Sequence, residues 1–171
     1  EPHSLDEVGR ALARFGDFGS VAEAEAARAA ARRFAGQLAL LRSRFSQRPP
    51  VRVFVQVWSM PLIGLSDRDL VGDLLHACGA VNVFGDAGVA APRLDPEAVL
   101  AARPQLVLAT EGAQAAQRWR ERGLLAPRGP ARFAVFDASM LHRPGPRVLQ
   151  AAQSLCTEID AVRRGGGTVQ P

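Results

Sequence analysis

A serine that follows a predicted strand and precedes a predicted helix is the first candidate for covalent chemistry. It lies in Gly64-Leu65-Ser66-Asp67-Arg68, and a sharp strand-to-helix turn can expose a nucleophilic serine. That turn closes only when a small residue stands where this sequence has Arg68. The sequence also lacks a GxGxxG or GxxxxGKS/T phosphate-binding loop. The pattern therefore favours the start of a helix over a catalytic serine.

The three histidines do not indicate a metal site. His3, His76 and His142 are scattered, and no HxxxH spacing would place two imidazoles on one ion. His76 lies within a predicted helix, where a surface position is the simplest interpretation. His142 lies in a predicted loop beside Arg143 and is the better candidate for a metal or cobalt ligand, although its spacing does not support that role. We expect no structural metal and no cofactor.

The two cysteines allow two interpretations. Cys78 and Cys156 each lie on the inner stripe of a predicted helix, 78 residues apart. Two buried free thiols would suit a cytosolic domain. A disulfide would instead tie the two helices together and place the protein outside the cytosol. The residues alone leave both alternatives open.

The loop after the first predicted strand is the place where we first expect ligand contact. Val51–Val57 is a nearly unbroken apolar and β-branched run of strand length, and Trp58 follows it directly. Continuous apolar strands are typical of parallel sheets that helices cover on both faces. In such sheets ligands bind where loops leave the carboxyl ends of the strands. The segment Trp58–Ser66 is therefore the leading candidate.

Helices and strands are predicted to alternate along the chain after residue 50. Asp95 as N-cap and Pro96 at the first helical position mark one clear helix start. The predicted elements are a helix over 67–78, an extended piece at 82–84, a helix over 95–103, a strand over 105–109, a helix over 112–122, a strand over 132–136 and a helix over 146–163. This alternation indicates an α/β fold, a three-layer α/β/α lobe with a mainly parallel sheet.

Two helices are predicted before this lobe. In residues 4–15, Ser4 and Glu7 form a capping-box pattern, and Leu5, Val8, Leu12 and Phe15 fall on one face. A much longer helix is predicted over residues 20–47, about 40 Å in length. Its apolar residues are spaced by 4, 3, 4, 3 and 4 positions and form one continuous stripe: Ala27, Ala31, Phe34, Leu38, Leu41 and Phe45.

Composition excludes several function classes. The apolar fraction of 47% is typical of a globular domain, and no apolar run is long enough to cross a bilayer. No signal peptide is predicted at the start of the sequence. All 21 basic residues are arginine, and the densest cluster, Arg118–Arg122, includes a carboxylate and lies on a predicted helix. We therefore expect no nucleic-acid partner.

Four segments together resemble the C-terminal lobe of periplasmic cobalamin-binding proteins: VRVFVQVWSMPL, DLLHACGAVNVFGD, LDPEAVLAARPQLVLAT and DASMLHRPGPRVLQAAQSLC. These proteins belong to the helical-backbone class of substrate-binding proteins, which serve ABC importers of vitamin B12, haem and iron-siderophores. In that class a long helix joins two α/β lobes, and the ligand binds between them. The resemblance covers residues 20–160. It implies an N-terminal-lobe remnant at 1–19, the backbone helix at 20–47, the C-terminal lobe at 48–164 and a flexible tail at 165–171.

The resemblance also implies roles for single residues. Cys78 and Cys156 match a disulfide pair of the B12-binding member. Arg143 matches an arginine of the ligand cleft, and Glu97 matches an exposed glutamate that docks onto arginines of the membrane permease. The remaining matched positions supply apolar side chains to the cleft: Trp58, Met60, Leu62 and Ile63.

Two positions depart from the family pattern. Ala91 stands where the B12-binding member has tryptophan, and Ser139 stands where it has an acidic residue. Both positions are expected to line the cleft. The sequence has no tyrosine, so a phenolate haem ligand cannot come from this lobe.

The resulting prediction is a periplasmic, noncatalytic substrate-binding component of an ABC importer. It would capture cobalamin or a related corrinoid and deliver that ligand to the permease subunits, its expected protein partners. An iron-siderophore or haem is the alternative ligand. A cytosolic α/β enzyme domain is the alternative from another class, and the lack of catalytic motifs disfavours it.

Overall fold

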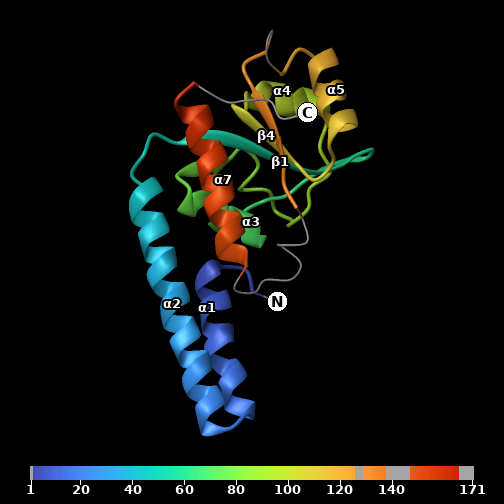
Figure 1. Ribbon diagram of the computed structural model, residues 1–171. Helices are drawn as coiled ribbons and strands as arrows, with labels where there is room; N and C mark the ends of the chain where they lie inside the picture. Colours follow the sequence, from blue (N-terminus) through green and yellow to red (C-terminus); the bar gives the residue numbers. More distant parts are fainter. Residues whose placement is uncertain (1, 126–128, 138–146, 166–171) are drawn as a thin grey trace.

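The computed structural model describes residues 2–125, 129–137 and 147–165. A helical hairpin projects from an α/β lobe that is built on one twisted sheet (Figure 1). The elements are α1 (Leu5–Arg14), the 3-10 turn η1 (Phe15–Phe18), α2 (Val21–Phe45), β1 (Val51–Ser59), β2 (Leu62–Gly64), α3 (Leu70–Ala77), β3 (Ala80–Asn82), α4 (Pro96–Ala102), β4 (Leu106–Ala109), α5 (Ala113–Glu121), β5 (Arg132–Val135) and α7 (Val148–Arg163). None of the described helices is both long and apolar enough to span a membrane.

The sheet is mainly parallel, as predicted. Strand β1 pairs in parallel with β4, and β4 pairs in parallel with β5. On its other side β1 pairs with two short strands, in parallel with β3 near its start and antiparallel with β2 near its end. The carboxyl ends of β1, β4 and β5 therefore meet at one edge of the sheet.

Helices cover both faces of the sheet, which confirms the three-layer architecture. Alternate residues of β1 point to opposite faces, so Val53 and Val55 belong to one core and Phe54 to the other. The first core contains the buried residues of α1, α2, α3 and α7. The second contains those of α4 and α5, where Phe54 meets Trp119 edge to face with ring centroids 6.0 Å apart.

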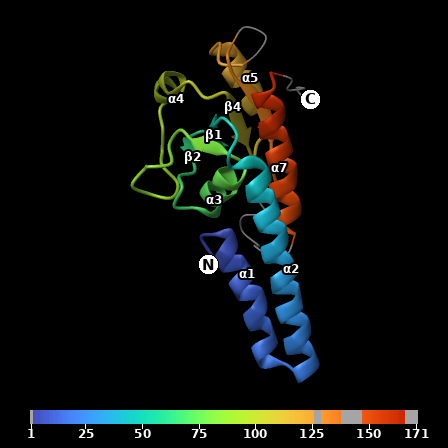
Figure 2. The same ribbon diagram turned by 90° about the vertical axis from the view of Figure 1, so that its left-hand side faces the viewer.

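The long helix forms as predicted and packs against α1 in an antiparallel hairpin (Figure 2). Ser20 and Glu23 form a full capping box at its start. The stripe of Phe34, Leu38, Leu41 and Phe45 is buried, whereas its alanines are only partly covered. At the lobe, Arg42 lies between Asp6 of α1 and Asp73 of α3, with contacts of 2.9 and 3.3 Å.

The capping box predicted for the first helix is only half formed. Ser4 Oγ accepts the backbone N–H of Glu7 at 3.2 Å, but the Glu7 carboxylate accepts the N–H of His3 instead of that of Ser4. The predicted apolar face is also wrong at its end. Phe15 is 76% exposed, because the chain leaves the α-helix there and enters η1.

The predicted loop from Trp58 to Ser66 is instead largely a β-hairpin. Strand β1 continues through Ser59, and the chain turns at the cis Met60-Pro61 bond and returns as β2. The extended piece predicted at 82–84 occurs two residues earlier, as β3. Asn82 is the last residue of that strand, and its buried side chain donates to the Leu65 carbonyl at 2.8 Å.

Candidate functional site

The carboxyl edge of the sheet carries two large apolar side chains that are well exposed. Trp58 is 58% exposed and Met60 is 73% exposed, both on the β1–β2 hairpin. Beside them lies a hollow of about 350 Å³, which we call the edge hollow. Its lining comes from the hairpin and from the start of α5: Trp58, Ser59, Met60, Glu111, Gly112, Ala113, Gln114 and Arg118.

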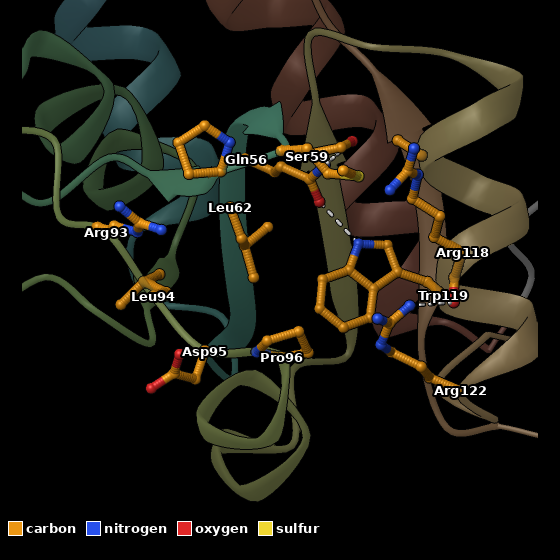
Figure 3. Close-up of a pocket in the computed structure, with 13 residues that line it drawn as sticks. Gln56, Ser59, Leu62, Arg93, Leu94, Asp95, Pro96, Arg118, Trp119 and Arg122 are labelled. Carbon is orange, nitrogen blue, oxygen red and sulfur yellow. Dashed lines mark hydrogen bonds between the residues drawn. The ribbon is translucent and has the colours of Figure 1, made fainter.

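A larger pocket of about 570 Å³ lies between the segment 93–96 and helix α5, which we call the arginine pocket (Figure 3). Its base is apolar, with the ring of Trp119 opposite Leu62. Arg93 lies on one wall, and Arg118 and Arg122 lie on the other. Ser59, Met60 and Arg118 border both hollows, so the two are neighbours.

A chain of hydrogen bonds connects the base of the arginine pocket to the edge hollow. Trp119 Nε1 donates to Gln56 Oε1 at 2.7 Å, and Gln56 Nε2 donates to Ser59 Oγ at 2.8 Å. The Ser59 hydroxyl in turn donates to the Glu111 carboxylate. Gln56 is only 1% exposed, and these bonds satisfy both ends of its buried amide. The network fixes the hairpin relative to α5 and so positions the neighbouring Trp58.

Strand pairing divides the predicted apolar cleft residues between two faces of the hairpin. Trp58 is paired with Ile63 and Ser59 with Leu62. Directly paired residues point to the same side of a sheet and successive residues to opposite sides. Trp58 and Ile63 therefore share one face, while Leu62 is 8% exposed and belongs to the second core.

The other predicted ligand-binding residues are only partly placed. Ala91 is exposed on the segment before Arg93. Ser139 and Arg143 lie outside the described residues, as does His142. Their predicted roles remain predictions.

Glu97 is exposed in the first turn of α4, directly after Asp95 and Pro96. The Asp95–Pro96 helix start is confirmed, although the Asp95 side chain makes no capping hydrogen bond. A carboxylate in a first helical turn is favoured by the helix dipole, and exposure leaves Glu97 accessible. Its predicted role in docking stays a prediction.

Ser66 is not placed as a nucleophile. It is fully buried, and its Oγ accepts the backbone N–H of Arg68 at 3.2 Å just before α3. His76 is on the surface as predicted, with Nε2 3.4 Å from the Asp67 carboxylate. Within the described ranges no group of three or more His, Cys, Asp or Glu residues is arranged to hold a metal ion.

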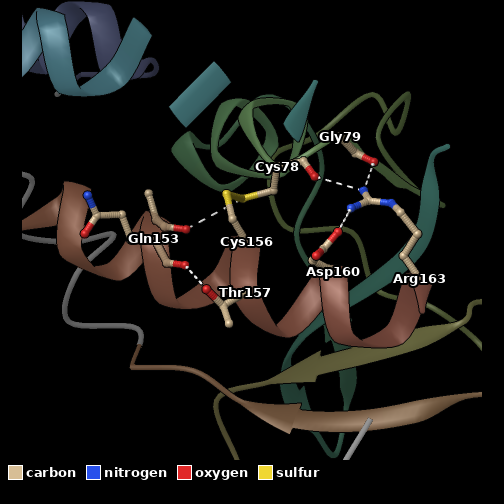
Figure 4. Close-up of a disulfide and its surroundings, with 8 residues drawn as sticks. Cys78, Gly79, Gln153, Cys156, Thr157, Asp160 and Arg163 are labelled. Carbon is tan, nitrogen blue, oxygen red and sulfur yellow. Dashed lines mark hydrogen bonds and ion pairs between the residues drawn. A yellow bond between two sulfur atoms is a disulfide. The ribbon is translucent and has the colours of Figure 1, made fainter. Parts of the chain in front are cut away.

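The disulfide implied by the resemblance is present in the structure (Figure 4). Cys78 at the end of α3 is bonded to Cys156 in α7, and both residues are fully buried. The free-thiol alternative is therefore wrong. The bond ties α3 to α7 on the face of the sheet that also packs against α2.

A buried carboxylate lies one helical turn further along α7. Asp160 accepts from Arg48 at 2.6 Å and Arg163 at 2.7 Å, and Arg164 lies 3.0 Å away. Burial, the largest single influence, raises the pKa of Asp160, but the hydrogen bonds and charges of these arginines outweigh it, so the pKa lies below its ordinary value. Asp160 is therefore a structural carboxylate.

Sequence reasoning did not identify the arginines of the second pocket. The sequence indicates Arg118 and Arg122 only as members of an arginine-rich cluster on a predicted helix, but both line the pocket, one turn apart on either side of Trp119. This i, i+4 spacing around a tryptophan is the signal that could have indicated them. Arg93 and Glu111 lie in segments without a periodic pattern and could not be placed from the sequence.

Solved structures with different ligands share the fold of this chain. A periplasmic heme-binding protein from Roseiflexus sp. RS-1 matches with a TM-score of 0.74 at 22% identity, over 94% of this chain and 65% of that chain. A possible iron-binding periplasmic protein from Staphylococcus epidermidis matches with a TM-score of 0.75 at 18% identity, over 92% and 63%. The chain therefore has the fold of the periplasmic binding proteins of the helical-backbone class. No family model matches it.

Within that class the chain is similar in sequence to vitamin B12-binding proteins. It is 30% identical over 164 residues to the Vibrio cholerae protein, covering 94% of this chain and 58% of that protein. The Yersinia pestis protein is 26% identical over 162 residues, covering 95% and 56%. The crystal structure of the Vibrio cholerae protein matches with a TM-score of 0.83 at 27% identity, over 96% and 64%. The resemblance is confirmed, and the chain spans a little over half the length of these curated relatives.

Proposed function

We propose that this chain is part of a periplasmic substrate-binding component of an ABC importer, which captures cobalamin or a related corrinoid between two lobes. The similarity to vitamin B12-binding proteins over 94% of the chain supports this function. The observation that carries it is the exposure of Trp58 and Met60 at the carboxyl edge of the sheet, where ligands of α/β proteins bind.

The chemistry of this edge suits a corrinoid. A corrinoid has flat apolar faces rimmed by amides, so it needs an aromatic surface and a few polar partners. The hydrogen-bond network through Gln56 and Ser59 holds the base of the hairpin that carries Trp58. Glu111, Gln114 and Arg118 offer acceptors and donors beside it. In this proposal Arg143 adds a donor for ligand amides or carboxylates.

The predicted division of the chain is part of the same proposal. Residues 20–47 would be the backbone helix between the lobes, with residues 1–19 as a remnant of the first lobe, 48–164 as the second lobe and 165–171 as a tail. The continuous, capped helix α2 supports this division. A rigid connection of this kind implies modest lobe motion when ligand binds.

Titration of the complete two-lobed protein with cyanocobalamin, haem and ferric siderophores tests the ligand class. Trp58→Ala is expected to weaken cyanocobalamin binding by roughly tenfold or more. The stacking of a flat ring system, such as a nucleobase, on an aromatic side chain contributes on the order of 1–3 kcal/mol. Leu40→Ala is the control, since Leu40 is also exposed but lies on α2 away from the edge. Binding of a ferric siderophore without binding of any corrinoid would show that the B12 assignment is wrong.

An iron-siderophore or haem is the second candidate ligand. It is favoured by the exposed Ala91, which removes the tryptophan that the family pattern places there. The fold shared with the heme-binding protein supports it as well. The titration above separates the two candidates.

Delivery to a permease is tested through Glu97. In proteoliposomes that contain the cognate importer, the ligand-loaded protein should stimulate ATP hydrolysis, and Glu97→Ala should reduce this stimulation. Glu121→Ala is the control, because Glu121 is exposed at the far end of α5. Equal stimulation by wild type and Glu97→Ala would remove Glu97 from the docking surface.

The proposed periplasmic location is tested through the cysteines of the protein isolated from its native compartment. The disulfide supports this location, since such bonds persist in oxidising compartments. Alkylation followed by intact-mass measurement should label neither cysteine without reductant and both with it. Labelling of both before reduction would contradict the proposal.

A further inference from the structure

The arginine pocket has an unbalanced charge. Arg93, Arg118 and Arg122 line it, and among its described lining residues Asp95 is the only acid. Figure 3 shows the Asp95 carboxylate directed away from the space between the walls. In the described parts of the chain no carboxylate forms an ion pair with any of the three arginines.

Two other partly buried arginines of this protein are paired with carboxylates. Arg42 contacts Asp6 and Asp73, and Arg163, with a side chain only 10% exposed, contacts Asp160 at 2.7 Å. Half-buried Arg118 has no such carboxylate among the residues that the structure describes. Since a partly desolvated guanidinium gains most from an anion, half-buried Arg118 is the best placed of the three to receive one, with the exposed Arg93 and Arg122 nearby.

Arg122, the C-cap residue of α5, is held in place beside the tryptophan. The guanidinium of Arg122 lies 6.0 Å from the centre of the Trp119 ring, and its Nη1 donates to the Arg118 carbonyl at 3.3 Å. Like charges four residues apart on a helix repel each other. An anion between them would remove this repulsion, at a position where one guanidinium is already oriented.

The base of the pocket offers little to a polar ligand. It is formed by apolar groups of Leu62, Leu94, Pro96 and Trp119. The Trp119 N–H and the Gln56 amide are already bonded to each other, so neither is available. The pocket therefore combines an apolar base with guanidinium walls, and its volume of about 570 Å³ falls within the range of small-molecule sites.

We propose that the arginine pocket binds an amphipathic organic anion, a molecule with a planar apolar body and one carboxylate, sulfonate or phosphate group. The body packs on Trp119 and Leu62, and the anionic group lies between the guanidiniums of Arg118 and Arg122, with Arg93 opposite. This site goes beyond the proposed function, because Trp58 is not among the described residues that line it, although Arg118 borders both hollows.

The test uses the chain itself with 2-naphthoate as the probe and 2-naphthamide as its uncharged counterpart. The chain has two tryptophans, so ¹H–¹⁵N spectra give two indole signals, which Trp58→Phe assigns. Naphthoate is expected to shift the Trp119 indole signal saturably, with naphthamide at least about tenfold weaker because it cannot form charge-assisted hydrogen bonds. Inorganic phosphate is expected to be at least about tenfold weaker as well, since it lacks an apolar body.

The double variant Arg118→Gln with Arg122→Gln should weaken naphthoate binding by about tenfold or more. Arg120→Gln should leave it within about twofold, because Arg120 is exposed on α5 and does not line the pocket. Equal binding of naphthoate and naphthamide would overturn the proposal. An equal loss of naphthoate binding in the double variant and in Arg120→Gln would overturn it as well. So would the absence of any saturable shift at Trp119. Trp58→Ala should leave naphthoate binding unchanged, so this result does not depend on the corrinoid assignment.

Discussion

The carboxyl edge of the sheet differs in construction from the opposite edge, where β1, β4 and β5 begin and which we call the amino edge. At the amino edge, Arg163 donates to the carbonyls of Pro49, Cys78 and Gly79 at 2.7 to 3.1 Å, as well as to Asp160. The disulfide lies within the same region (Figure 4). At the carboxyl edge, Trp58 and Met60 are exposed, and the neighbouring arginines have no carboxylate partner among the described residues.

The amino edge therefore supplies stability, and the carboxyl edge presents groups that can bind a ligand. The covalent link and the saturated ion pairs join α2, α3, β1 and α7 far from the carboxyl edge, and they hold the strand ends in register. The carboxyl edge can then present groups that are unfavourable in isolation, such as an exposed aromatic ring and repelling cations. Functional sites often carry such local costs while the rest of the fold compensates for them.

Gly79 shows how closely the amino edge is packed. It has φ +65°, and a Cβ atom there would lie 2.3 Å from the Phe45 carbonyl oxygen. The end of α3 therefore approaches the end of α2 within a distance that only glycine allows. Arg163 bonds the carbonyl of this same residue, which connects α7 to the junction.

The comparison predicts the largest loss of stability for removal of the disulfide. Replacing Cys78 and Cys156 by alanine should lower the free energy of unfolding by roughly 4–5 kcal/mol, since the bond closes a 78-residue loop of the unfolded chain. Urea unfolding of the variant and of oxidised wild type gives the difference. Reduced wild type is the control and should unfold at nearly the same urea concentration as the variant. A loss below about 1 kcal/mol would show that the amino edge does not depend on its covalent link.

A smaller loss is predicted for Asp160→Asn, about 2–3 kcal/mol at neutral pH, because two of its three arginine partners can become solvated. The lowered pKa of Asp160 means that its stabilisation is present above the ordinary value of about 3.9 and is lost as pH falls through the folded-state value. Unfolding measured from pH 7 downward should therefore show wild type and variant converging below about pH 4. Asp86→Asn is the control, since Asp86 is exposed and has no ion pair among the described contacts. A constant difference at all pH values would contradict the ionic role.

At the carboxyl edge, Trp58→Ala should change the free energy of unfolding by less than about 0.5 kcal/mol, because the side chain is 58% exposed. Phe54→Ala, on the same strand but fully buried, is the contrasting variant and should cost about 3–5 kcal/mol. Thermal or urea unfolding distinguishes them. A loss of more than about 2 kcal/mol for Trp58→Ala would place its ring in the core instead of at a binding surface.

The smallest expected effect has the opposite sign. Arg118→Gln should stabilise the chain by a few tenths of a kcal/mol at low ionic strength, because it removes repulsion from Arg122 one turn away. The gain should shrink as salt is added, since salt screens exposed charges. Destabilisation by Arg118→Gln would show that the arginine has a structural partner and would weaken the contrast between the two edges.

Much of this architecture could be predicted from local patterns. The Asp95-Pro96 helix start and the strand at Val51 depend on capping and periodicity, which neighbouring residues determine. The stripe of the long helix could likewise be read from spacing, because an apolar face of that length must be buried. The carboxyl-edge location of Trp58 followed from the order of elements.

The hairpin and the pocket could not be predicted in this way. Whether Leu62 joins Trp58 in a cleft or enters the core depends on the register between β1 and β2, which the local sequence does not fix. The hydrogen-bond chain from Trp119 to Glu111 joins residues on three separate segments, and its geometry exists only after they pack.

The sequence by itself determined the layers of this protein, its long helix, the resemblance to a binding-protein class and the residues of the covalent link. Periodicity and capping act over a few residues, so the chain encodes them directly. The tertiary structure decided that the two cysteines meet at the amino edge, which arginines surround Asp160 there, and which arginines around Trp119 have no carboxylate partner among the described residues. Those outcomes depend on distances between segments far apart in the chain, and only the packed sheet and its helices set them.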